Sequence, residues 1–282
     1  MLARTSPNKN HPTSNSHISG LMKDSLVTSV LLLVWLTTLC YLVHAIASNL
    51  SGVVSFRDAI ALLAPTGPEF LLCIVPLAAY VVAVRAYGTI AAPQAHVKRA
   101  HVSSSTAAIF SSSASNLLLI RPLLASHAGM WGVRAPAVLW GMLVVDTAEF
   151  WPHWAMHRVG GLYQSFHYVH HAMGEPAPST AFHNHPIDIA LTTPPLLGGL
   201  LVCRLSFAEW ICVTSLAFVA TVCDHTSADP FAFHYVHHCV NRNSNFQQPF
   251  FTFYDQLMGT YDARSSPKLP FWPYPRPACL SW

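Results

Sequence analysis

Apolar residues along this chain gather in long blocks separated by shorter polar segments. Residues 1–24 are polar and are expected to form a disordered tail. The apolar segments 26–47 and 69–88 are each long enough to cross a hydrocarbon core of about 30 Å. Segments 105–125 and 135–151 are also apolar, but charged residues within them leave open whether they cross the membrane, re-enter it or lie at its surface.

Two further apolar stretches, 187–203 and 206–223, are separated by Arg204. They are slightly short for full spans and predict a helical hairpin that enters the membrane and returns. The polar, histidine-rich segments before and after this hairpin would then face the same side of the membrane, where they could build one site.

The composition agrees with a membrane protein. Hydrophobic residues make up 52% of the 282 residues and charged residues only 10%, whereas soluble domains carry about a quarter. The net charge of +3 and the scattered basic residues give no sign of nucleic-acid binding. Basic residues before the first span and after the second predict a cytosolic N-terminus, which would place the sequon at Asn49 in the lumen. The seven cysteines have no CxxC spacing, so neither a disulfide framework nor a cysteine zinc site is expected.

Histidine is the unusual residue, because 11 of the 17 histidines fall between His153 and His238. They form an HxxxH, His153 to His157, and two HxxHH motifs, His167 to His171 and His234 to His238. Residues four apart lie on one face of a helix, so each motif aims several imidazoles at one region. Eight such ligands exceed the needs of one tetrahedral ion and predict two neighbouring metals. Five carboxylates are candidates for orienting these ligands: Asp146, Glu149, Asp188, Asp224 and Asp255.

Two soluble hydrolase classes do not fit. HxxxH has Trp154 where the zinc-protease motif HExxH requires the glutamate that acts as general base. No GxSxG motif of a serine hydrolase is present either. A membrane metal-binding or metal-transport protein without redox chemistry stays open as an alternative, although a transporter would carry its ligands inside the spans.

The order HxxxH, HxxHH, apolar hairpin, HxxHH resembles the fatty acid hydroxylase/sterol desaturase superfamily of membrane di-iron oxidases. Three further stretches carry the resemblance: Asp146 with Phe150–His153, Pro176–Asp188, and Asn245–Tyr261. In motif detail they are most similar to sterol C5-desaturases. The residues Trp154, Tyr168 and Gln256 depart from the common family pattern and leave room for a divergent member that acts on another lipid or terpenoid.

The resemblance implies the ligand set residue by residue. The family's metal ligands fall on the motif histidines, with His185 and His225 as additional matches, so the candidate metal site is His153, His157, His167, His170, His171, His185, His225, His234, His237 and His238. No catalytic residue beyond these ligands is expected.

The resemblance also implies the activity: two iron ions and O2 would hydroxylate or desaturate a sterol, terpenoid or fatty-acyl lipid, with electrons from cytochrome b5 or an NADH-type donor. The expected fold is all-α, a multi-span membrane protein with about four transmembrane helices and a cytosolic histidine-rich cap, located in the endoplasmic reticulum. The expected divisions are a tail at 1–24, a transmembrane region at 25–134, a catalytic domain at 135–262 and a C-terminal tail at 263–282.

Overall fold

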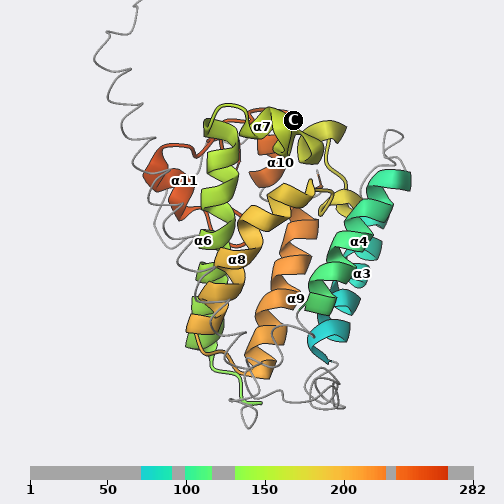
Figure 1. The fold of residues 1–282 in the computed structure, drawn as a ribbon, viewed down its shortest axis with the longest axis vertical. Helices are drawn as coiled ribbons and strands as arrows, with labels where there is room; N and C mark the ends of the chain where they lie inside the picture. Colours follow the sequence, from blue (N-terminus) through green and yellow to red (C-terminus); the bar gives the residue numbers. More distant parts are fainter. Residues whose placement is uncertain (1–70, 91–98, 116–130, 227–232, 266–282) are drawn as a thin grey trace, which may run out of the picture.

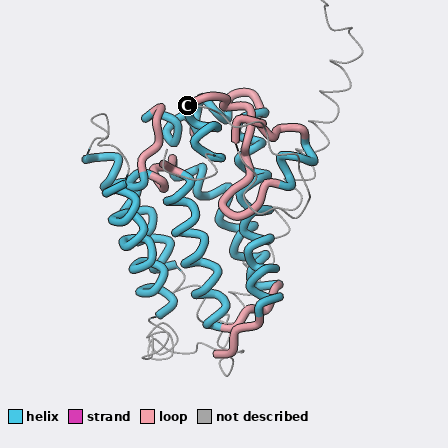
Figure 2. Tube along the Cα trace, turned by 180° about the vertical axis from the view of Figure 1, so that it is seen from behind, coloured by secondary structure: helices cyan, strands magenta, loops and turns pink. Residues whose placement is uncertain are grey.

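A computed structural model describes residues 71–90, 99–115, 131–226 and 233–265. The expected tail at 1–24, the apolar segment 26–47 and nearly all of the C-terminal tail lie outside these residues. The described part of the chain is all-helical and contains no strand (Figure 2), as the sequence predicted.

Five long helices stand side by side (Figure 1): α3 (Leu71–Ile90), α4 (Arg99–Ser115), α6 (Ala135–Arg158), α8 (Pro186–Val202) and α9 (Phe207–Asp224). Short helices gather at one end of them: α7 (Leu162–Ser165), the 3-10 helices η4 (His167–Met173) and η5 (Pro178–Thr180), α10 (Phe233–Cys239) and α11 (Phe253–Met258). In the described chain, therefore, a helical bundle carries a cap of short helices and loops.

The predicted apolar hairpin is confirmed as α8 and α9, joined by a short turn at Arg204. The turn is stabilised by a capping box, in which Ser206 accepts from the backbone of Glu209 and the Glu209 carboxylate accepts from the backbone of Ser206. The same carboxylate accepts hydrogen bonds from Arg134, just before α6. These contacts join the starts of α6 and α9 at the end of the bundle opposite the cap.

Helix α6 packs closely against the hairpin because it meets small residues there. A Cβ added to Gly199 of α8 would lie 2.5 Å from Val144 Cγ1, and one added to Gly141 of α6 would lie 2.8 Å from Val213 Cγ2. The apolar core between these helices includes Val145, Leu200 and the fully buried Trp210. Close packing of α6, α8 and α9 fixes the ends of the helices from which the cap residues project.

Two helices in the described residues are long and apolar enough to cross a bilayer, at Leu71–Gly88 and Phe207–Asp224. Helix α3 also exposes apolar side chains to its surroundings, with Ile74 53% and Val82 66% exposed. An exposed apolar face of this kind is costly in water and is expected of a helix in contact with lipid. Of the about four spans predicted from the sequence, the two that correspond to α3 and α9 are thus supported.

Candidate metal centre

Nine histidines converge at the cap end of the bundle and form two groups. The first histidine group consists of His153, His157, His167, His171 and His237. The second histidine group consists of His170, His225, His234 and His238. Within each group the candidate ligand nitrogens all lie within 4.8 Å of one another. Each group is therefore compact enough to surround one metal ion.

The two HxxHH motifs each supply both groups. His170 and His171 are adjacent in η4, yet His171 belongs to the first group and His170 to the second. The neighbours His237 and His238 of α10 divide in the same way. Successive side chains point about 100–120° apart in α- and 3-10 helices, so a histidine pair can reach two metals at once. The first HxxHH forms a 3-10 helix. The sequence predicted that each motif would direct its imidazoles at one region, but in the structure each motif contributes to both groups.

Four of the nine rings are oriented through Nδ1 by an acceptor outside the groups. His153 donates to the Phe246 carbonyl at 2.8 Å, and His237 donates to the Ser244 carbonyl at 2.7 Å. His225 donates to the Thr221 carbonyl at 2.7 Å, while His167 donates to the Asp188 carboxylate at 2.8 Å. Such bonds are typical of metal-binding histidines, because they fix the tautomer and leave Nε2 as the ligand atom.

The nitrogens that face one another are arranged to bind a cation. Carbonyl oxygens only accept, so Nδ1 of both His153 and His237 carries the proton and Nε2 of each presents a lone pair. These two Nε2 atoms lie 3.1 Å apart, and His237 Nε2 lies 3.1 Å from His171 Nε2. Two neutral rings in this arrangement repel each other, whereas a metal ion would bind both lone pairs. The buried Nε2 atoms of His157 and His167, which have no hydrogen-bond partner, fit the same reading.

Protonation does not relieve this repulsion at neutral pH, because burial keeps the imidazole rings neutral. Desolvation lowers the pKa of His167 and that of His170 to about 3 in each case. Burial first, and neighbouring histidines second, hold the pKa well below its ordinary value for His171, His234, His237 and His238. Neutral imidazole is the form that binds iron, zinc or copper, so the groups are ready for a transition metal at neutral pH.

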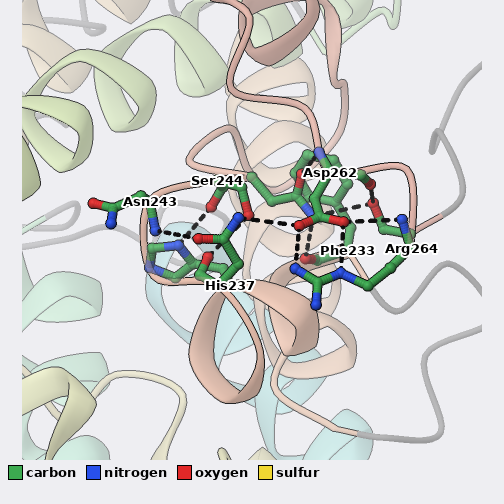
Figure 3. A network of polar contacts seen from close by, with 9 residues as sticks. Phe233, His237, Asn243, Ser244, Asp262 and Arg264 are labelled. Carbon is green, nitrogen blue, oxygen red and sulfur yellow. Dashed lines mark hydrogen bonds and ion pairs between the residues drawn. The ribbon is translucent and has the colours of Figure 1, made fainter. Parts of the chain in front are cut away.

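The loop after α10 fixes the position of His237 through a polar network (Figure 3). Ser244, whose carbonyl binds His237, also donates from Oγ to the Asn241 carbonyl, and Asn241 Nδ2 donates to Asp262 at 3.1 Å. Arg264 binds both oxygens of Asp262, at 2.9 and 2.6 Å, and holds the pKa of that carboxyl well below its usual range. The His237 ring is thus positioned, through Ser244 and Asn241, by the ion pair of Asp262 and Arg264 outside the histidine groups.

Asp146 and Asp255 hold the loop that carries the Phe246 carbonyl. Asp255 accepts from the backbone N–H groups of Phe246 and Gln247 at 2.9 and 2.6 Å. Asp146 accepts from the Gln247 side chain at 2.9 Å and from two backbone N–H groups farther along the loop. Among the carboxylates considered in the sequence, Asp188 binds a grouped histidine directly, whereas Asp146 and Asp255 act through the backbone of the loop.

His185 lies outside both histidine groups, whereas the other nine predicted ligands lie within them. Its Nδ1 accepts from the backbone N–H of Ile187 at 3.2 Å, and its ring contacts Phe166. His185 directly precedes α8, and it is Asp188, in the first turn of that helix, whose side chain binds His167. Metal binding by the nine grouped histidines stays a prediction, and the placement of His185 does not favour it as a direct ligand.

A cavity of about 280 Å³ extends from the histidine groups into the bundle. It is lined at one end by His153, His167 and His170. Its wall continues along α8 from Asp188 to Leu200, a length of about 18 Å at a rise of about 1.5 Å per residue. Trp210 and Leu200 close the far end with apolar surface. Sequence reasoning did not find this cavity, since its lining residues come from four long helices, from η4 and from loops, and form no motif.

Comparison with known proteins gives a consistent result. Residues 138–260 match the sequence model of the fatty acid hydroxylase family, which confirms the resemblance to the fatty acid hydroxylase/sterol desaturase superfamily. Sphingolipid C4-hydroxylase SUR2 of Saccharomyces cerevisiae is 34% identical over 145 residues, covering 46% of this chain and 42% of that protein. Sphinganine C4-monooxygenase 2 of Arabidopsis thaliana is 35% identical over 135 residues, covering 43% of this chain and 52% of that protein.

A third relative, the very-long-chain aldehyde decarbonylase GL1-9 of Oryza sativa subsp. indica, is 29% identical over 143 residues, covering 46% of this chain and 55% of that protein. The chain thus spans about half the length of the curated relatives it matches. No solved structure gives a significant match. The relatives named here are not sterol desaturases, so the expected likeness to sterol C5-desaturases finds no support in them.

Proposed function

We propose that this chain, which belongs to the fatty acid hydroxylase/sterol desaturase superfamily through residues 138–260, is a membrane-bound O2-dependent enzyme that hydroxylates a sphinganine-like lipid. The observation that carries the proposal is the position of the two histidine groups at the polar end of a cavity whose far end is apolar. A metal pair there would face the reacting carbon of a lipid whose chain lies along α8.

The residues present fit two iron ions, which when bound supply the oxidation of an unactivated C–H bond by O2. The chain's own residues perform the positioning. The carbonyls of Phe246, Ser244 and Thr221 and the carboxylate of Asp188 hold four ligand rings in place, and close packing of α6 against α8 keeps the groups together. The apolar wall of the cavity excludes water from the chain of the lipid.

The relatives narrow the reaction and the substrate. The sequence alone left hydroxylation and desaturation open, and it allowed sterols, terpenoids and fatty-acyl lipids. Two of the relatives described above are named as C4-hydroxylating enzymes of sphingolipids or sphinganine. We therefore favour hydroxylation of a long-chain amino alcohol over desaturation of a sterol or terpenoid.

The remaining parts of the proposal concern location and electron supply. The two candidate spans and the apolar face of α3 support a membrane location. We propose a multi-pass protein of the endoplasmic reticulum whose histidine cap faces the cytosol, as the distribution of basic residues predicts. Cytochrome b5, or an equivalent NADH-dependent donor on that face, would reduce the metals.

Metal transport is less well supported. A transporter needs polar or charged ligands along a path through its spans. The grouped histidines instead lie at the cap end, in η4, in α10, in the last two turns of α6 and directly after α9. The cavity beneath them ends in apolar residues and offers a metal ion no further ligands there.

The test is expression in a host that lacks its own sphinganine hydroxylase, followed by lipid mass spectrometry. We expect a new sphingolipid that has gained one oxygen atom, and we expect it to be absent with His170→Ala or His237→Ala variants that insert normally. Loss of two hydrogens instead of gain of oxygen would establish desaturation. Equal product from the wild type and both variants would refute the proposed site.

A further inference from the structure

Helix α6 presents one face to the cavity, and this face carries a single carboxylate. Val145, Glu149 and His153 follow one another at intervals of four residues and all line the cavity. Glu149 therefore lies one turn, about 6 Å along the axis, from a member of the first histidine group. The cavity wall around it becomes apolar toward Leu200 and Trp210.

Glu149 differs from the other acidic residues near the site in having no partner. Its carboxylate makes no hydrogen bond and no ion pair with any residue in the described part of the chain, and it lines the cavity. Asp188, Asp146 and Asp255, by contrast, each accept hydrogen bonds at 2.9 Å or less. An ionised carboxylate without a partner is unfavourable in a buried cavity, and an ammonium group brought by a ligand would stabilise it.

The structure argues against a role for Glu149 at the metals. It belongs to neither histidine group, in each of which the ligand nitrogens lie within 4.8 Å of one another. It does not orient its neighbour on the helix either, because His153 Nδ1 donates to the Phe246 carbonyl. Glu149 instead lines the cavity, where an organic cation would be a ligand of opposite charge.

We propose that Glu149 binds the ammonium group of a long-chain amino-alcohol substrate and thereby sets which carbon lies at the metal pair. The proposal rests on the proposed function for its substrate class and adds the residue that recognises it. An ammonium ion held one helical turn from His153 would place the carbons next to the amine at the metals and the alkyl chain along α8 toward Leu200. Oxidation would fall a few bonds from the amine.

The experiment measures equilibrium binding to the purified full chain in nanodiscs, with sphinganine and N-acetylsphinganine as probes. The acetyl group replaces the ammonium ion by a neutral amide while the chain and hydroxyl groups stay the same. Glu149→Gln removes the charge with little change of shape. Glu175→Gln is the matched control, because Glu175 is an exposed carboxylate outside the cavity lining.

We expect Glu149→Gln to weaken sphinganine binding by about tenfold or more, the value of a charged hydrogen bond, and to change N-acetylsphinganine binding by less than about threefold. Glu175→Gln should bind both probes as the wild type does. Equal sphinganine binding by Glu149→Gln and wild type would overturn the proposal, as would an equal loss for both probes.

The lipid analysis separates this proposal from the function on which it rests. If the wild type binds sphinganine through Glu149 but forms no hydroxylated product, the proposed function fails and the recognition stands. If product forms and Glu149→Gln binds sphinganine normally, the function stands and the recognition fails. Metal content measured in parallel should be the same in wild type and Glu149→Gln, and a loss of metal in the variant would contradict the assignment of Glu149 to the substrate.

Discussion

Replacing Asp188 by asparagine removes the charge that orients His167 and leaves the shape of the site nearly unchanged. The Asp188 carboxylate accepts from His167 Nδ1 at 2.8 Å, and both side chains are less than a tenth exposed, so solvent screens the bond little. A hydrogen bond to a charged acceptor stabilises by about 1.5–3 kcal/mol and a neutral one by about 0.5–1.5. The midpoints of these ranges differ by about 1.3 kcal/mol, which corresponds to roughly tenfold weaker metal binding.

The assay is competition for iron between the purified protein and a chelator of known affinity. Asp188→Asn should lose the metal of the first histidine group at about tenfold lower chelator concentration, because Asp188 binds His167 of that group. The metal affinity of the second histidine group should change less. Glu149→Gln is the matched control, because it removes a neighbouring carboxylate that binds no histidine. Wild-type metal affinity in Asp188→Asn, or an equal loss in Glu149→Gln, would refute the argument that the His167 bond tunes the site.

Three further predictions concern stability and chain length. The pKa of His167 and that of His170 are about 3 in the folded protein and 6.5 in the unfolded chain. Between these values the unfolded chain binds more protons, so the free energy of unfolding is highest above pH 6.5 and falls on acidification. Metal-free protein should lose about 3 kcal/mol from these two rings at about pH 5.5, and pH-independent thermal unfolding would contradict this. Gly199→Ala should lower stability by about 1 kcal/mol, because overpacking against Val144 exceeds the gain in helix propensity; an unchanged melting temperature in detergent would disprove the close contact. Leu200→Trp should fill the far end of the cavity and raise KM for long-chain substrates at least severalfold while sparing shorter ones, and an unchanged chain-length profile would place the alkyl chain elsewhere.

The sequence predicted the features that depend on local spacing. The apolar hairpin and the helix that carries HxxxH followed from hydrophobic runs and from the pairing of His153 with His157, and the structure has both. The predicted meeting of the segments on either side of the hairpin is confirmed by the contact of His170 with His225 and His238. These features are set by helix geometry, which the spacing of side chains reports directly.

Other features of the site depend on the backbone and on packing, and spacing does not report them. The division of each HxxHH between two groups depends on the orientation of η4 and α10 relative to each other. The carbonyls of Phe246 and Ser244 orient two ligand rings, and a carbonyl group is common to every residue. The sequence identified Asp146 and Asp255 as candidate partners of the ligands, but their role runs through the loop that they hold. Glu149 belonged to the same set of candidates, but it lines the cavity and makes no hydrogen bond within the described part of the chain.

The count and identity of bound metal test the central claim most directly. Full-length protein, purified from iron-supplied cells in nanodiscs, would be analysed for metals against an accurate protein concentration. The arrangement of the nine histidines predicts two metal ions per chain, one for each group, and the family predicts that both are iron. A single metal per chain, or zinc in place of iron at both positions, would contradict it.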